Sequence, residues 1–69
     1  MEKISINTDI IKLDQFLKWA GVSASGADAK NIILEGKVKV NNEIILQRGK
    51  KLHKGDIIAV EGGNEFIVE

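Results

Sequence analysis

GKVKVNNEIILQRGKKLHKGD, which spans Gly36–Asp56, carries the strongest structural signal in this sequence of 69 residues. It begins with an alternation in which Lys37 and Lys39 are interleaved with Val38 and Val40. Successive side chains of a strand point to opposite faces of a sheet. The alternation therefore predicts a strand that is apolar on one face and cationic on the other.

The same stretch continues as a predicted hairpin. Asn41 and Asn42 follow the strand, and both tolerate the positive φ that a tight two-residue turn requires. The chain then returns through Glu43–Leu46 and enters a basic run, Arg48–Lys51. We expect the basic run to lie just beyond the returning strand.

Charge is strongly segregated along the chain, although the formal net charge is zero. Residues 36–55 contain six lysines or arginines and one acid, Glu43, whereas residues 56–69 contain four acids and no base. A local concentration of positive charge in a neutral chain is typical of proteins that bind a polyanion. The pattern predicts such a partner for the central segment.

Composition excludes several other classes of protein. The chain has no cysteine and one histidine, which excludes a disulfide, a thiolate metal site and a zinc cluster. No apolar run approaches the roughly 20 residues that cross a bilayer, and the first residues lack the layout of a secretory signal. We therefore expect a single cytoplasmic domain over residues 1–69, without cofactor, metal or membrane contact.

A strand and a helix are expected before the basic stretch. Residues 2–6 alternate apolar and polar side chains, which predicts the strand, and Asn7–Asp9 can cap a helix after it. Gly21 is the expected end of that helix. The helix itself is indicated by an apolar stripe at helical spacing, formed by Leu13, Phe16, Leu17 and Ala20.

A second helix should follow almost at once. Ser25 is a good N-cap, and Asp28 three residues later completes the capping-box pattern. Gly36 is the expected end, and the buried side would comprise Ala29, Ile32 and Ile33. Two further strands are expected within 56–61 and 65–68. The order of elements predicts an α+β fold, with two short packed helices against a small, mostly antiparallel sheet.

The ordered motifs of the chain resemble the alpha-L RNA-binding motif, also called the S-four domain. They are Leu13-Asp14-x-x-Leu17, Gly21, Ser25, Ala29, Ile32 or Ile33, Gly36-x-Val38-x-Val40-Asn41 and Gly55-Asp56-x-Ile58. The resemblance covers roughly residues 12–60. Within the family, the chain looks most like the small stand-alone bacterial YaaA/YbcJ type, through Ser25-Gly26-x-x-Ala29-Lys30 and Arg48-x-Lys50-Lys51-Leu52.

The resemblance implies RNA binding by a helix-turn-helix surface beside the sheet. With the charge pattern, it gives a candidate RNA-binding set of Lys12, Ser25, Lys30, Lys37, Lys39, Arg48, Lys50 and Lys51. Lys12 stands where many members have an arginine, so the charge is kept but a bidentate phosphate contact is lost. Gly26 also replaces a usual arginine, and the Arg48–Lys51 run would supply charge in its place.

The function that the resemblance implies is non-catalytic binding of structured RNA. The expected partner is ribosomal RNA, tRNA or a ribosomal subunit, in ribosome assembly, translation or quality control. We expect a monomer with no small-molecule substrate. An enzyme is disfavoured, because the chain offers no nucleophile–base pair and no Gly-rich phosphate loop.

Several of these residues also have purely structural interpretations. Lys37 and Lys39, taken alone, are compatible with the solvated face of an edge hairpin. Trp19 shares a helix side with Lys12 and Gln15 by its spacing. We interpret Trp19 as a partly buried packing residue, since single-strand binders usually stack several aromatics and none lies near the basic run. His53 and Asp56 are interpreted as turn residues.

Two other classes of function are weighed against RNA binding. Val40–Ile44 and Gly55–Ile58 also resemble part of the β-grasp sulfur carriers, but those need a terminal Gly-Gly, and here residues 64–69 follow it. The paired helices would also suit a DNA-binding or protein-interaction module. The second helix, however, carries Lys30 opposed by acids, which disfavours readout of base edges.

Overall fold

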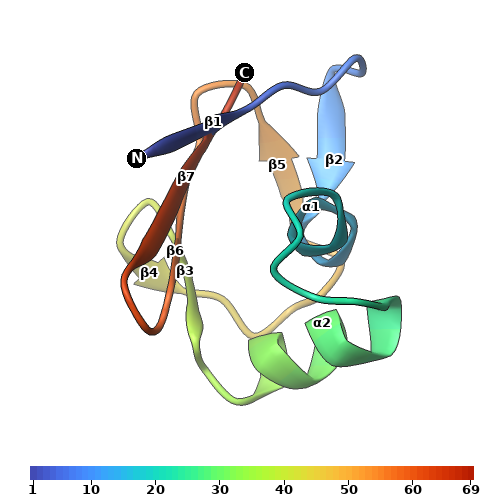
Figure 1. The fold of residues 1–69 in the computed structure, drawn as a ribbon, viewed down its shortest axis with the longest axis vertical. Coiled ribbons are helices and arrows are strands. Elements are labelled where there is room, and N and C mark those ends of the chain that lie inside the picture. The colour runs from blue at the N-terminus through green and yellow to red at the C-terminus, as the bar shows by residue number, and fades with distance from the viewer.

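The computed structural model describes all residues from 1 to 69 and arranges two helices and two sheets around a shared core (Figure 1). The larger sheet has the strand order β1-β7-β6-β3-β4, and the smaller one pairs β2 with β5. The elements are β1 (Glu2–Ile4), β2 (Ile10–Lys12), α1 (Leu13–Trp19), α2 (Gly26–Leu34), β3 (Val38–Val40), β4 (Glu43–Ile44), β5 (Lys51–His53), β6 (Ile57–Val60) and β7 (Asn64–Val68). Only β1 and β7 pair in parallel. The predicted α+β fold with a mostly antiparallel sheet is confirmed.

Helix α1 forms where the apolar stripe predicted it. Leu13, Phe16 and Leu17 are fully buried, and Gly21 beyond the helix has a φ of 79°, which suits its role as the stop. The predicted cap at residues 7–9 is wrong. The short strand β2 lies between that segment and α1, so the capping side chains are too far from the helix start.

Helix α2 matches its predicted signals closely. The Oγ of Ser25 accepts a hydrogen bond from the backbone N–H of Asp28 at 3.2 Å, which confirms the N-cap. Ala29 and Ile33 are fully buried against the rest of the protein. Gly36 follows the helix with a φ of 74°, as its position predicted. Neither helix of the fold is long and apolar enough to cross a membrane.

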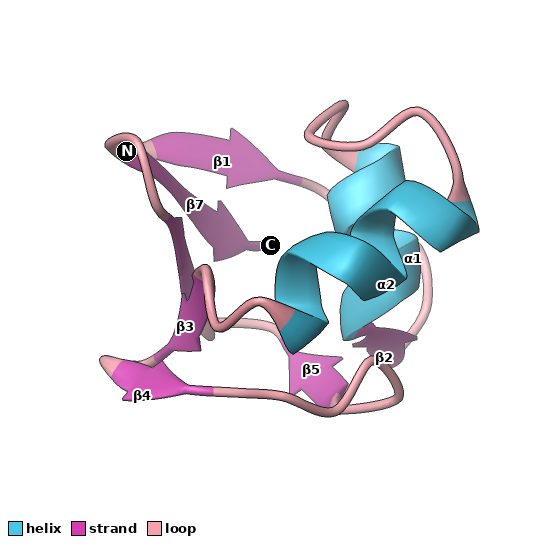
Figure 2. Cartoon of the chain, turned by 90° about the horizontal axis from the view of Figure 1, so that it is seen from below, coloured by secondary structure: helices cyan, strands magenta, loops and turns pink.

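The hairpin after α2 has the predicted turn. Asn41 and Asn42 have φ values of 51° and 71°, the left-handed conformation that a two-residue hairpin turn needs. The return strand is shorter than predicted, because β4 contains only Glu43 and Ile44. Beyond Ile45 the chain leaves the sheet and crosses to β5 as the loop that carries the basic run (Figure 2).

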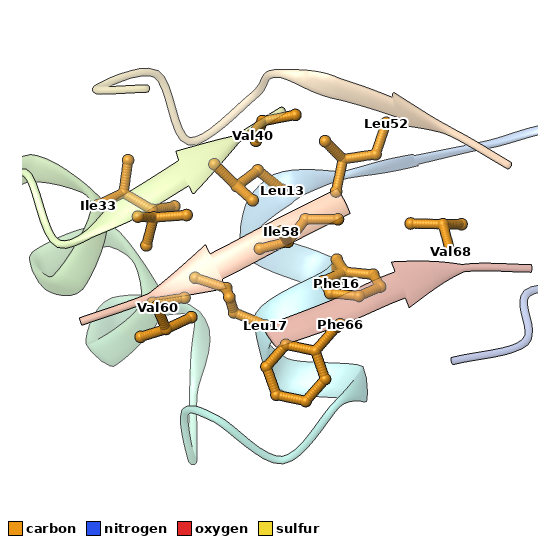
Figure 3. Packing of buried hydrophobic residues seen from close by; sticks show 12 residues of the cluster. Leu13, Phe16, Leu17, Ile33, Val40, Leu52, Ile58, Val60, Phe66 and Val68 are labelled. Atoms are coloured by element: carbon orange, nitrogen blue, oxygen red, sulfur yellow. The ribbon is translucent and has the colours of Figure 1, made fainter. Parts of the chain in front are cut away.

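The core lies between the helices and one face of the larger sheet (Figure 3). The rings of Phe16 and Phe66 meet edge to face with their centroids 6.0 Å apart, which joins α1 to β7. Leu52 of β5 is fully buried and ties the smaller sheet to the same core. The remaining buried side chains come from both helices and from β3, β6 and β7: Leu13, Leu17, Ala29, Ile33, Val38, Val40, Ile58, Val60 and Val68.

A polar clamp fixes the turn between β5 and β6 to the end of β3. The side chain of Asn41 donates to Asp56 Oδ1 at 3.1 Å and accepts from the N–H of Ile57 at 3.0 Å. Asp56 Oδ2 accepts from the N–H of His53 at 2.8 Å, which confirms Asp56 as a turn residue. Two motif residues of the resemblance, Asn41 and Asp56, therefore serve the fold.

Candidate nucleic-acid interface

The smaller sheet brings two lysines from distant parts of the sequence together. In the pairing of β2 with β5, Lys12 lies directly opposite Lys51, and Ile11 lies opposite Leu52. Because Ile11 and Leu52 face the core, Lys12 and Lys51 share the outer face. Like charges directly opposite each other on a strand pair are destabilising.

The basic loop is also bound to the start of α1. The backbone N–H groups of Leu13 and Asp14 donate to the carbonyls of Lys50 at 2.8 Å and Arg48 at 3.1 Å. The side chain of Lys12, at the N-cap position, makes no capping hydrogen bond. The loop backbone therefore satisfies two N–H groups at the helix start that side chains usually cap.

These contacts gather four of the predicted site residues around the start of α1. We call Lys12, Arg48, Lys50 and Lys51 the basic cluster; Figure 2 shows β2 and β5 beside that end of the helix. All four side chains are exposed, and none has an acidic partner within the 4.0 Å of an ion pair. The cluster therefore presents four cations to solvent without an ion pair, although the acids Glu43 and Asp56 line a hollow with Lys50 and Lys51.

Lys37 and Lys39 have different surroundings. Lys37 Nζ lies 3.2 Å from Glu35 Oε1 in an exposed ion pair. Lys39 projects from the outer face of β3, where its cross-strand partners are Ile44 and Ala59. Both lysines line a shallow hollow together with Glu35 and Glu61. Acids thus stand beside these two lysines, although the sequence between residues 36 and 42 contains none.

The last two predicted residues are Ser25, the N-cap of α2, and Lys30 within that helix. The Oγ of Ser25 is occupied by the helix cap, although the hydroxyl hydrogen remains available to an acceptor. Lys30 is exposed on the same helix and has no ion pair. The structure thus gathers half of the candidate set and distributes the rest over the N-cap and body of α2, β3 and the residue before β3. No three His, Asp or Glu side chains come together in a way that could hold a metal ion.

A groove beside the basic cluster is lined by Trp19 and by Lys12 of the cluster. Trp19 is 66% exposed, so its interpretation as a packing residue is wrong. Its Nε1–H donates to the carbonyl of Ser5 at 3.0 Å, which fixes the indole at the rim. The predicted proximity of Lys12, Gln15 and Trp19 is confirmed, because all three line this groove of about 640 Å³.

Comparison with known proteins gives consistent matches. The sequence model of the S4 domain matches residues 4–69. The probable ribosome maturation protein RlbA of Bacillus subtilis is 48% identical over 65 residues, which are 94% of this chain and 92% of that protein. An uncharacterized RNA pseudouridine synthase of Aquifex aeolicus is 43% identical over 53 residues, or 75% of this chain and 21% of that protein.

A solved structure shares both the fold and part of the sequence. The solution structure of YbcJ from E. coli, described as revealing an alpha-L motif involved in RNA binding, matches with a TM-score of 0.72. The match covers 99% of this chain and 86% of YbcJ at 31% sequence identity. The similarity therefore extends over both helices and both sheets.

Proposed function

Because this chain belongs to the S4 domain family, we propose that it is a non-catalytic RNA-binding protein whose basic cluster contacts the phosphates of structured RNA. The observation that carries the proposal is the pairing of Lys12 with Lys51, with the neighbouring backbone of Arg48 and Lys50 bound to α1. Bringing like charges together on paired strands costs stability. A polyanion that binds across the cluster offsets that cost by neutralising the charges.

Ribosomal RNA is the target that we propose. RlbA matches over nearly the full length of both chains and is named a probable ribosome maturation protein, which supports a role in the assembly of a ribosomal subunit. The scarcity of aromatic residues suits recognition of RNA through its shape, phosphates and 2′-hydroxyl groups. tRNA is the second candidate target. The proposal also includes the predicted contacts outside the cluster, which are Ser25, Lys30, Lys37 and Lys39.

The pseudouridine synthase does not extend this proposal to catalysis. The matched segment makes up only 21% of the pseudouridine synthase. The similarity therefore does not assign the catalytic activity of that protein to the part that it shares with this chain. In the present structure Asp56 is engaged in the clamp with Asn41, and His53 is an exposed residue at the same turn. Asp56 thus has a structural role at this turn.

The structure also bears on the sulfur-carrier alternative. Gly62 and Gly63 form the turn between β6 and β7, with φ values of 107° and 101°. Strand β7 follows them and pairs with both β6 and β1, so it is an interior strand of the sheet. Cleavage after Gly63 would remove Phe66 and Val68 from the core. A terminal Gly-Gly is therefore incompatible with this fold.

A salt-series binding titration tests the proposal. Ribosomal subunits, tRNA and duplex DNA are titrated in parallel with the protein at several salt concentrations. We expect one RNA species to bind more tightly than DNA. Four phosphate contacts predict a slope of log affinity against log salt of about −3 to −4. Equal weak binding to all three ligands, or none, would overturn the proposal.

A further inference from the structure

We propose that the groove beside the basic cluster binds a single unpaired nucleotide, whose base stacks on Trp19 while its phosphate lies between Lys12 and Lys18. The inference rests on the proposed function and specifies the RNA feature that the protein would select. The groove lies between the segment that joins β1 to β2 and the exposed side of α1. Its volume of about 640 Å³ falls within the roughly 300–1,000 Å³ of small-ligand sites.

Trp19 has the properties of a stacking platform. The side chain is 66% exposed, and yet its orientation is fixed by the hydrogen bond of Nε1 to Ser5 at 3.0 Å. The bond uses the edge of the indole, and most of the side chain stays accessible to a ligand. Nucleobases stack on such aromatic faces whatever their identity, because every base has a π-face.

The charge and polarity around Trp19 also suit a nucleotide. Lys12 and Lys18 line the groove, and neither forms an ion pair within the protein. Asn7 and Gln15 line it as well, and their side-chain amides are not engaged in the hydrogen bonds of the fold. Amides supply both donors and acceptors, as the edge of a base requires.

The position of Lys12 connects the groove to the basic cluster. Lys12 lines the groove and also lies opposite Lys51 in the smaller sheet. A nucleotide in the groove would therefore be continuous with phosphates bound at the cluster. Because the groove holds one aromatic residue, it accommodates one base and not a single strand of several bases. A bulged or flipped-out nucleotide in otherwise paired RNA offers one unstacked base for the groove and neighbouring phosphates for the basic cluster.

The chain contains its own reporter for this site. Trp19 is its only tryptophan, so the emission of the protein reports on the groove alone. We would compare three short RNA hairpins that carry either one unpaired adenosine in the stem, an abasic nucleotide at that place, or a fully paired stem. Anisotropy of the labelled hairpins measures affinity at low salt, and tryptophan emission measures stacking in the same samples.

We expect the hairpin with the unpaired adenosine to bind roughly 5- to 100-fold more tightly than the other two, as the loss of one base–aromatic stack predicts. Only that hairpin should strongly quench Trp19. The Trp19→Ala variant should bind the three hairpins equally, and Trp19→Phe should retain part of the preference. Leu34→Ala is the matched control, since Leu34 is an apolar residue of α2 that is 56% exposed.

The outcomes separate this inference from the function on which it rests. Equal affinity and equal quenching for the unpaired and abasic hairpins would overturn the nucleotide site while leaving RNA binding intact. Failure to bind any hairpin at low salt would overturn both. An emission change on concentrating the protein without RNA would assign the groove to a second copy and also overturn the inference. If Trp19→Ala fails to fold, the three hairpins still decide with the wild-type protein.

Discussion

The two ends of the segment from Gly36 to Asp56 are both rich in lysine, but the fold treats them differently. At the first end, Lys37 is paired with Glu35, and Lys39 lies on the open face of β3. At the second end, Arg48–Lys51 meets Lys12 from a distant strand, and none of these cations forms an ion pair, although Glu43 and Asp56 line a hollow with Lys50 and Lys51. The contrast shows that the availability of a charge depends on the neighbours that tertiary structure brings to it.

Charge reversal at the two ends should give the largest difference. We expect Lys50→Glu with Lys51→Glu to abolish most of the RNA affinity and to make the salt slope shallower by about 2, because two phosphate contacts are lost. The control is Lys37→Glu with Lys39→Glu, which changes the net charge equally and should cost less affinity. RNA titrations of folded variants measure both.

The two charge-reversal variants can also contradict the proposed difference between the two ends of the segment. Equal losses would mean that both ends contact RNA equally. Unchanged affinity in a folded variant at Lys50 and Lys51 would exclude the basic cluster as the binding site.

The clamp between the two ends should matter for stability more than for binding. We expect Asn41→Ala to lower the free energy of unfolding more than Asn42→Ala does, by about 1–3 kcal/mol. Both asparagines have positive φ, so both variants introduce the same kind of strain, but only Asn41 bonds to Asp56 and Ile57. Urea unfolding measures the difference, and equal losses would mean that the clamp adds nothing.

Local signals in the sequence were sufficient for the hairpin turn, the cap of α2 and the apolar stripe of α1. Each depends on residues a few positions apart, as in the bond between Ser25 and Asp28. The pairing of β2 with β5 was not predictable in this way. It joins two strands of three residues each, separated by both helices and a hairpin, and neither has a pattern of its own.

In the candidate site, too, the local features could be predicted from the sequence and the long-range contacts could not. The sequence identified the cations, but only the β2–β5 pairing shows that Lys12 lies opposite Lys51. The sequence did not predict the cap of α1, because backbone carbonyls of the basic loop provide it. Every residue has a backbone carbonyl, so no residue type indicates such a cap. Trp19 was misjudged for a related reason: its exposure depends on which elements cover α1, and none covers that side completely.

Ser25 belongs to neither end of the segment, and its substitution tests whether the interface extends to α2. We expect Ser25→Ala to destabilise the protein by about 1 kcal/mol through loss of the cap. That corresponds to a fall in Tm of about 4–8 °C for a domain of this size. Thermal unfolding measures it.

The control for this loss is Ser23→Ala in the same turn. Ser23 is buried, and its Oγ has no hydrogen-bond partner, so its removal should be neutral or stabilising. A Tm of Ser25→Ala equal to that of the wild type would argue against the cap. Ser25→Asp keeps a capping side chain but adds negative charge. A loss of RNA affinity in that variant, at unchanged stability, would bring the start of α2 into the interface.

The smallest expected effect concerns the cost of holding Lys12 opposite Lys51. We expect Lys51→Gln to raise the free energy of unfolding by a few tenths of a kcal/mol at low salt, since it relieves a cross-strand repulsion. Lys39→Gln is the matched control, because Lys39 is also an exposed strand lysine but has Ile44 and Ala59 as its partners. The stabilisation by Lys51→Gln should vanish at high salt, where exposed charges are screened.

Urea unfolding at two salt concentrations measures this stabilisation, and RNA titrations measure the affinity of the same variants. A variant that is more stable and yet binds RNA less tightly would show that the pairing of these lysines is kept for binding. Equal stability of the two variants at low salt would mean that the two lysines avoid each other in solution and that the cluster carries no such cost.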